Sequence, residues 1–215
     1  PIVLNTPFTI IKTILVNNIE SITYYSDEKV EEIYTPKTII NGNGYHKGKN
    51  VVLVILESFA KEYVGGFNKG KGYTPFIDSL LNESYVFTNA YANGSRSIEA
   101  LPCLLAGVPQ LMAEPYVLSN YAGNQIQGFP EILKEDGYNT SFYHGGANGT
   151  MGFNGFVGVA GIDNYFGLNE YPFQEKDYDG LWGIFDEPYL QYFASELNNK
   201  QEPFFSSVFT VSSHH

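Results

Sequence analysis

An unbroken run of apolar residues begins just after Asn50 and is the clearest structural signal in the chain. Residues 51–56 are all apolar, four of them are β-branched, and the run ends at Glu57. A short run of this kind is typical of a strand that is buried on both faces. We therefore predict a strand in the middle of a mainly parallel sheet. Ligands collect outside the carboxyl ends of such strands, so Glu57 is either a functional residue or a solvated carboxylate.

Strand and helix patterns alternate along the rest of the chain. Strands are predicted over residues 84–90, 138–143 and 203–211, and helices over 74–81, 97–107, 129–136, 152–161 and 186–197. The aromatic and acidic stretch 164–179 is expected to form a surface loop. Because the connections are long enough for crossovers, the pattern predicts an α/β fold of three αβα layers, with helices on both faces of a mainly parallel sheet.

The segment around Ser97 combines a polar turn with an apolar helix. Residues 92–96 form the turn, and Gly107 is expected to end the helix in a left-handed conformation. Ser97 is either the N-cap of this helix or a hydroxyl at its positive end, where an alkoxide or a bound phosphate is stabilised. Pro102 removes an intrahelical donor, which favours a helix that begins later.

The first 49 residues differ in character from the rest. Residues 8–24 have apolar positions compatible with an amphipathic helix, and residues 36–49 are rich in turn-forming residues, typical of a linker. His46 falls in this linker and is expected to be solvated. We expect a linker segment over 1–49 and a separate domain over 50–215.

Composition narrows the classes of function. With 43% hydrophobic and 16% charged residues, the 215-residue chain is globular. Its formal net charge of -11 argues against nucleic acid and anionic membrane surfaces as main partners, and an anionic substrate would need a metal or a cluster of donors. Cys103 is the only cysteine, which excludes an internal disulfide and a cysteine zinc cluster. No apolar run approaches the ~20 residues that span a bilayer.

Four residues with chemically useful side chains follow predicted strands at distant points of the sequence. Glu57, His144 and His214 follow three of the strands, and Ser97 follows the strand predicted over 84–90. Because the carboxyl ends of parallel strands share one edge of a sheet, the four residues are candidates for a common site.

The segments around these residues resemble the motifs of a known family. Residues 50–59 resemble the first metal-binding motif of lipoteichoic acid synthase and related sulfatase-like proteins of the alkaline phosphatase superfamily. Residues 94–103 resemble the nucleophile motif of the phosphoethanolamine and phosphoglycerol transferases in that superfamily. Residues 143–146 and 211–215 fall where members carry substrate-binding histidines. The resemblance covers about residues 37–215.

This resemblance implies a role for each candidate residue. Glu57 is expected to bind a metal, and Ser97, rather than Ser95, to be both nucleophile and metal ligand. His144 and His214, the latter rather than His215, are expected to contact the phosphate or headgroup of the substrate. The implied cofactor is one divalent metal, either manganese, magnesium or zinc. The implied reaction transfers a phospho-alcohol headgroup from a phospholipid to a glycan or lipid through a covalent Ser97 intermediate.

The sequence also departs from the family's patterns. Gly146, Met151 and Phe153 stand where the glycerol-phosphate polymerases carry Asp, Trp and Arg, so the headgroup is left open. The single cysteine argues against close kinship with the phosphoethanolamine enzymes, which are rich in disulfides. No Cys/Ser-x-Pro-x-Arg signature occurs, which disfavours hydrolysis of sulfate esters.

The resemblance further implies that this chain is part of a longer protein. Family members carry membrane helices before the linker and an Asp-His metal motif downstream. We therefore expect a partial domain from the extracytoplasmic face of the bacterial membrane, inactive alone, with an incomplete metal site and an uncovered apolar sheet edge or face. A phosphodiesterase or sulfatase of the same superfamily is one alternative. A non-catalytic module that binds glycans or lipids through some of its 17 Tyr and 16 Phe is another.

Overall fold

A computed structural model describes residue 7, residues 22–35 and residues 48–214. The chain divides into two compact units, Pro1–Tyr45 and His46–His215. In the first unit, helix α2 (Asp27–Ile33) begins after Ser26, whose hydroxyl accepts a hydrogen bond from the Lys29 amide, and none of its residues is buried. Most of the helix predicted over 8–24, together with His46 and His215, lies outside the described residues.

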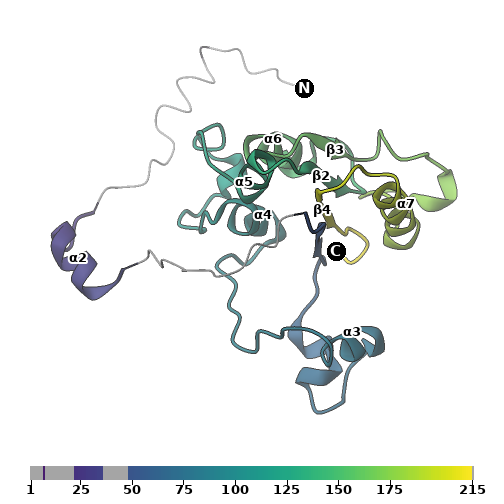
Figure 1. The fold of residues 1–215 in the computed structure, drawn as a ribbon, viewed down its shortest axis with the longest axis horizontal. Helices are drawn as coiled ribbons and strands as arrows, with labels where there is room; N and C mark the ends of the chain where they lie inside the picture. Colours follow the sequence, from purple (N-terminus) through teal and green to yellow (C-terminus); the bar gives the residue numbers. More distant parts are fainter. Residues whose placement is uncertain (1–6, 8–21, 36–47, 215) are drawn as a thin grey trace. The chain divides into compact units, whose positions relative to one another are not determined.

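Four parallel strands form one sheet in the described part of the second unit (Figure 1). They are β1 (Val51–Ile55), β2 (Asn139–His144), β3 (Asn164–Phe166) and β4 (Phe204–Phe209), in the order β1-β4-β2-β3. Although β4 is last in sequence, it lies between β1 and β2, and all six of its residues are buried. Ile55 and His144 both pair with Phe209, so the carboxyl ends of three strands meet at one edge.

The prediction that the first strand lies in the middle of the sheet is wrong. Within the described residues, β1 stands at one end of the strand order. Val52 and Val54 are 45% and 50% exposed, whereas Val51, Leu53 and Ile55 pack against the core. A run of apolar residues indicates a strand, but it does not show which of its faces a helix will cover. Within the described residues, the two valines agree with the expected uncovered apolar edge or face of the sheet.

Helices cover both faces of the sheet, as the predicted αβα layering requires (Figure 1). On one face, α4 (Ser97–Ala106), α5 (Phe129–Glu135) and α6 (Phe153–Val159) pack against a core that includes Phe142 and Phe205. On the other face, α7 (Asp186–Asn198) places Tyr189 and Phe193 against Tyr143 and Val208. None of the helices in the described ranges has the length and apolar character to cross a bilayer.

Helix α4 begins at Ser97 itself, with Arg96 as its N-cap. The interpretation of Ser97 as N-cap is therefore wrong by one residue. The expectation that the helix begins later is also wrong, because Pro102 lies inside the helix. The helix tolerates the lost donor since Leu101 and Leu105 on either side of the proline are fully buried. Gly107 ends the helix at φ 63°, which confirms the predicted left-handed stop.

Short helices and turns make up most of the remaining described chain. Helix α3 (Pro75–Leu80) has Thr74 as its N-cap, but the Thr74 hydroxyl donates to the Tyr63 carbonyl and to Asp78 instead of accepting from a helix amide. Five 3-10 turns complete the set: η1 (Lys61–Tyr63), η2 (Gly65–Phe67), η3 (Tyr116–Leu118), η4 (Thr150–Gly152) and η5 (Glu175–Asp177).

Two further sequence predictions fail. Residues 84–90 form no strand; Tyr85 and Phe87 are 98% and 82% exposed. Side chains that alternate between two faces do not make a short segment a strand, because its backbone also needs a neighbouring strand as hydrogen-bond partner. The loop expected over 164–179 contains the short strand β3, which pairs with β2, and the turn η5.

Candidate active site

Glu57 lies just beyond the end of β1 and is buried, at 8% exposure. Its amide donates a hydrogen bond to the hydroxyl of Thr210 at 2.8 Å, and the Thr210 amide donates to the carbonyl of Ile55 at 3.1 Å. The Ser58 hydroxyl donates to Glu57 Oε1 at 2.9 Å. These contacts hold the carboxylate at the carboxyl edge of the sheet, so the solvated alternative for Glu57 does not describe its surroundings.

His144 is the last residue of β2 and its ring is buried. Nδ1 lies 3.0 Å from the carbonyl oxygen of Phe209, and because a carbonyl only accepts, Nδ1 carries the proton. Burial lowers the pKa of His144, so the ring is neutral at pH 7. Nε2 is then an acceptor, and it is buried with no hydrogen-bond partner among the described residues.

Close backbone contacts shape the surroundings of His144. Gly146 and Gly183 form an antiparallel bridge, and a Cβ on Gly183 would lie 2.4 Å from the carbonyl oxygen of Gly145. A Cβ on Gly146 would lie 2.8 Å from Nε2 of His144. Any other residue at Gly146 would therefore crowd the unpartnered nitrogen.

His214 is held against the loop that precedes α7. Its ring packs on Trp182 with ring centroids 4.1 Å apart, and its Nδ1 is buried without a partner in the described part of the chain. Asp186, at the start of α7, accepts hydrogen bonds from the amides of Val211 and Ser212 at 2.7 and 3.1 Å. The bridge between Gly146 and Gly183 joins the segment after His144 to the loop that carries Trp182, so His144 and His214 lie in one region.

Ser97 enters from the helix layer rather than from a strand. It is half-buried at the first position of α4, and the strand expected before it is absent. The adjacent Ile98 belongs to the same core cluster that Ile55 packs against, so the start of α4 covers the face of the sheet on which the Ile55 side chain lies.

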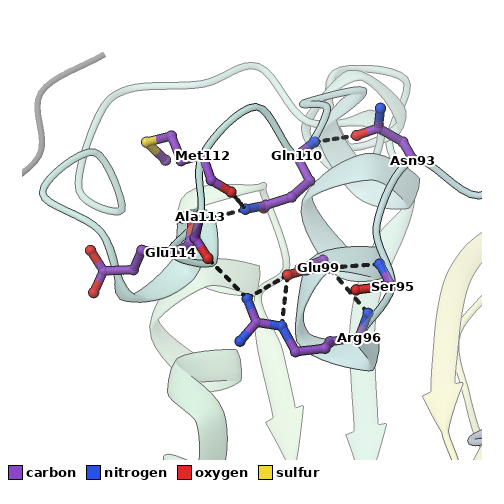
Figure 2. Close-up of polar contacts among 8 residues, drawn as sticks. All are labelled: Asn93, Ser95, Arg96, Glu99, Gln110, Met112, Ala113 and Glu114. Atoms are coloured by element: carbon purple, nitrogen blue, oxygen red, sulfur yellow. Dashed lines mark hydrogen bonds and ion pairs between the residues drawn. The ribbon is translucent and has the colours of Figure 1, made fainter. Parts of the chain in front are cut away.

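A polar network surrounds the turn before Ser97 (Figure 2). The buried carboxylate of Glu99 accepts hydrogen bonds from the amides of Ser95 and Arg96 at 2.7 and 3.1 Å and from Arg96 Nε at 2.8 Å. The bond from the Arg96 side chain is the main cause that lowers the pKa of Glu99. Arg96 Nη2 also donates to the carbonyl of Ala113 at 3.2 Å.

The described residues do not make a complete site for a divalent metal. No group of three or more His, Cys, Asp or Glu side chains in the described ranges is arranged to hold one. Glu57 and Ser97 offer two ligand residues, whereas magnesium takes about six ligands and catalytic zinc takes about three from the protein. Further ligands are needed before this donor set fits a metal.

The structure thus joins Glu57 and His144 through the end of β4 and places His214 in the same region. Sequence reasoning missed Thr210, Trp182, Asp186 and the role of Glu99. Glu99 had a local signal, because a glutamate at the third helical position typically bonds the N-cap amide. Thr210 and Trp182 had none, since their partners are remote in sequence.

Comparisons with known proteins cover most of the chain. A family model described as Sulfatase matches residues 49–215. Lipoteichoic acid synthase 2 of Bacillus subtilis (strain 168) is 28% identical over 174 residues, which are 80% of this chain and 27% of that protein. The chain therefore spans well under half the length of the curated relatives it matches.

Solved structures share the fold. A protein in the alkaline phosphatase superfamily from Vibrio parahaemolyticus is 31% identical, with a TM-score of 0.70, over 78% of this chain and 41% of its own. The lipoteichoic acid synthase LtaP from Listeria monocytogenes is 22% identical, with a TM-score of 0.70, over 87% and 47%. The C-terminal periplasmic domain of EcEptC from Escherichia coli, solved in complex with Zn, is 20% identical, with a TM-score of 0.56, over 78% and 44%.

Proposed function

This chain belongs to the sulfatase family, and from that premise we propose that the whole protein transfers a phospho-alcohol headgroup from a phospholipid to a glycan or lipid. The family resemblance inferred from the motifs around Glu57 and Ser97 is confirmed. Two of the similar proteins, from Bacillus subtilis and Listeria monocytogenes, are lipoteichoic acid synthases, which supports transfer of a phospho-alcohol group. The headgroup of the proposed reaction is phosphoglycerol-like or phosphoethanolamine-like. We place the reaction at the extracytoplasmic face of the bacterial cell membrane.

Ser97 is the nucleophile of the proposed reaction. Its Oγ attacks the phosphorus of the headgroup phosphodiester, so that an Oγ–P bond forms and the bond from phosphorus to the lipid alcohol breaks. The serine proton ends on the departing alcohol. A hydroxyl of the acceptor then attacks the same phosphorus, and its proton returns to Ser97 as the Oγ–P bond breaks. The position of Ser97 at the first turn of α4 favours the negative charge that develops there.

Glu57 and Ser97 are the two described oxygen donors proposed for one divalent metal, either manganese, magnesium or zinc. The zinc complex among the structural neighbours supports a metal in this fold. When bound, such an ion lowers the pKa of a hydroxyl and neutralises phosphoryl oxygens. Within the described residues, no group of three or more His, Cys, Asp or Glu side chains completes this ligand set.

His144 and His214 are proposed to contact the headgroup. Because Nδ1 of His144 is committed to Phe209, its Nε2 can accept but not donate at pH 7. This nitrogen suits a hydroxyl or ammonium of the headgroup better than an ionised phosphate oxygen. Since Nε2 is buried, the contact requires a shift of the adjacent Gly145–Gly146 loop.

One observation carries the proposal. Glu57 and His144, which are 87 positions apart, both bond residues at the end of β4, at the sheet edge where α/β enzymes hold their ligands. Both residues lie inside the stretch that matches the family model.

The test uses the whole protein and a phospholipid with a radiolabelled headgroup. Ser97→Ala should abolish transfer to the acceptor, whereas Ser95→Ala, which removes an exposed hydroxyl two residues earlier, should retain it. Undiminished transfer by Ser97→Ala would overturn the assignment.

Two alternatives have observations of their own. The family model is described as Sulfatase, which favours a hydrolase that uses water as the acceptor. Release of free headgroup without a transfer product would favour this hydrolase.

The second alternative is a module that binds glycans or lipids. Tyr73, Tyr85 and Tyr91 are 86%, 98% and 91% exposed, which suits such a module. Glycan or lipid binding that is lost on Tyr85→Ala, in a wild-type protein without turnover, would favour that module.

A further inference from the structure

The carboxylate of Glu99 is the centre of the polar network at the start of α4 (Figure 2). Its side chain is 5% exposed. Oε2 accepts from two consecutive backbone amides, those of Ser95 and Arg96, and Oε1 accepts from the Arg96 side chain through Nε at 2.8 Å and Nη2 at 2.6 Å. Both oxygens are therefore occupied by donors, and all of those donors belong to the two residues directly before Ser97.

The backbone is shaped to admit this carboxylate. A Cβ on Gly94 would lie 2.5 Å from the Cβ of Glu99 and 2.8 Å from Oε2. A side chain at position 94 would thus push Glu99 away from the amides that it holds. The turn 94–96 and the first turn of α4 consequently form one unit, whose geometry depends on the carboxylate at position 99.

A second segment supports the same turn. Arg96 Nη2 donates to the carbonyl of Ala113 at 3.2 Å, and the Gln110 amide donates to Oδ1 of Asn93. Gln110 Nε2 in turn donates to the carbonyls of Met112 and Glu114. Segments 93–99 and 110–114 are thus joined by two hydrogen bonds, one from Gln110 to Asn93 and one from Arg96 to Ala113. The turn is fixed by this second segment as well as by Glu99.

We propose that Glu99 is a positioning residue for Ser97. It fixes the backbone from which the serine projects, and Arg96 transmits the hold to segment 110–114. The proposal rests on the function proposed for Ser97. A purely structural role would affect how much protein folds, whereas a positioning role affects how fast each folded molecule reacts. Misplacing a reacting group by about 1 Å can cost about 100-fold in rate.

The test compares Glu99→Gln with Glu170→Gln in the whole protein. Glu170 is the matched control, because its carboxylate likewise accepts hydrogen bonds from a backbone amide, that of Gly167 at 2.6 Å, and from the side chain of Asn148, and it has no role in the proposed reaction. Both oxygens of the Glu99 carboxylate accept hydrogen bonds. In either orientation of its side-chain amide, a glutamine at position 99 would point its NH2 group at one set of these donors, and that set would lose its acceptor. The measurements are kcat and KM for a soluble chromogenic phosphodiester, the melting temperature, and the amount and rate of covalent headgroup labelling of Ser97 in a single turnover.

We expect Glu99→Gln to lower kcat and the labelling rate about 100-fold with KM changed less than about threefold, while the labelled fraction and the melting temperature match those of Glu170→Gln. Arg96→Lys keeps the charge and both amide bonds but loses the planar fork, so its loss in kcat should be smaller. A wild-type kcat in Glu99→Gln, or a fall in labelled fraction at an unchanged rate, would overturn the proposal.

If Glu99→Gln does not fold, Arg96→Lys decides the question by the same split between labelling rate and labelled fraction. Failure of the proposed function gives a different result, because Ser97→Ala would then keep its turnover whatever the Glu99 variant does.

Discussion

The backbone amide of Glu57 donates a hydrogen bond to the hydroxyl of Thr210 at 2.8 Å, across 153 positions of sequence. Thr210 directly follows β4, and its own amide bonds the last residue of β1. This pair of contacts joins the carboxyl ends of two neighbouring strands and determines where the Glu57 carboxylate lies.

Replacing Thr210 by the isosteric valine should destabilise the protein. The buried amide of Glu57 would lose its acceptor, and an unsatisfied buried donor costs about 1–3 kcal/mol. Thr210→Ser keeps the hydroxyl and should lose much less. Denaturation in urea measures both; equal free energies of unfolding for Thr210→Val and wild type would show that water replaces the bond.

Two glycine-to-alanine changes should have opposite effects. In Gly183→Ala the new Cβ would lie 2.4 Å from the carbonyl oxygen of Gly145, so the backbone must move, which costs about 1–3 kcal/mol. Gly155 lies within α6, where a Cβ would have no neighbour within 4 Å among the described residues, and Gly155→Ala should gain about 0.5–1 kcal/mol from helix propensity. Thermal unfolding compares them, and a stable Gly183→Ala protein would contradict the close approach.

The stability of the protein should fall in mild acid because of His144. Burial lowers the pKa of His144 in the folded state, while the unfolded chain titrates near 6.5. The unfolded state therefore binds the proton more readily than the folded state. The contribution of neutral His144 to the free energy of unfolding is fully present above pH 6.5 and is lost as the pH falls below it.

The comparison for this pH effect is His144→Gln, which keeps a side-chain N–H to donate to Phe209 but does not titrate. The free energy of unfolding, measured from pH 8 to pH 5, should decline less in the variant than in wild type. Parallel pH profiles would show that His144 does not carry the effect.

The 215-residue chain by itself should bind manganese, magnesium and zinc weakly and should not turn over a phosphodiester. The reason is that the described ranges contain no three-residue group of acidic, histidine or cysteine ligands. Isothermal titration calorimetry, with Glu57→Gln as the control, checks this. Micromolar binding that Glu57→Gln abolishes would mean that the chain already holds a complete site.

Local signals in the sequence determined many of the elements. The apolar run of β1, the helix that Gly107 ends and the helix that begins at Asp186 are all present, with ends that differ by a few residues. These features depend on propensity and capping, which involve residues within one or two turns of each other. The parallel αβα class and the family also follow from the sequence, because both depend on the order of elements and motifs.

The tertiary structure alone decided how the strands are arranged. The sequence Phe-Phe-Ser-Ser-Val-Phe of β4 does not read as the most buried strand, yet all its residues are buried, and Ser206 pairs with Ser141 at 2.8 Å. Conversely, the wholly apolar β1 lies at the edge of the described sheet. Burial of a strand depends on its neighbours, and those neighbours are 65 to 154 positions away.

The candidate site divides in the same way. Sequence motifs alone pointed to Glu57, Ser97, His144 and His214, whose proposed roles await the experiments above. Only the structure placed Glu57 with Thr210, His144 with Phe209 and His214 with Trp182. The physical reason is that a motif reflects the chemistry a side chain can perform, whereas its orientation depends on hydrogen bonds and ring contacts with residues remote in sequence, which no local pattern encodes.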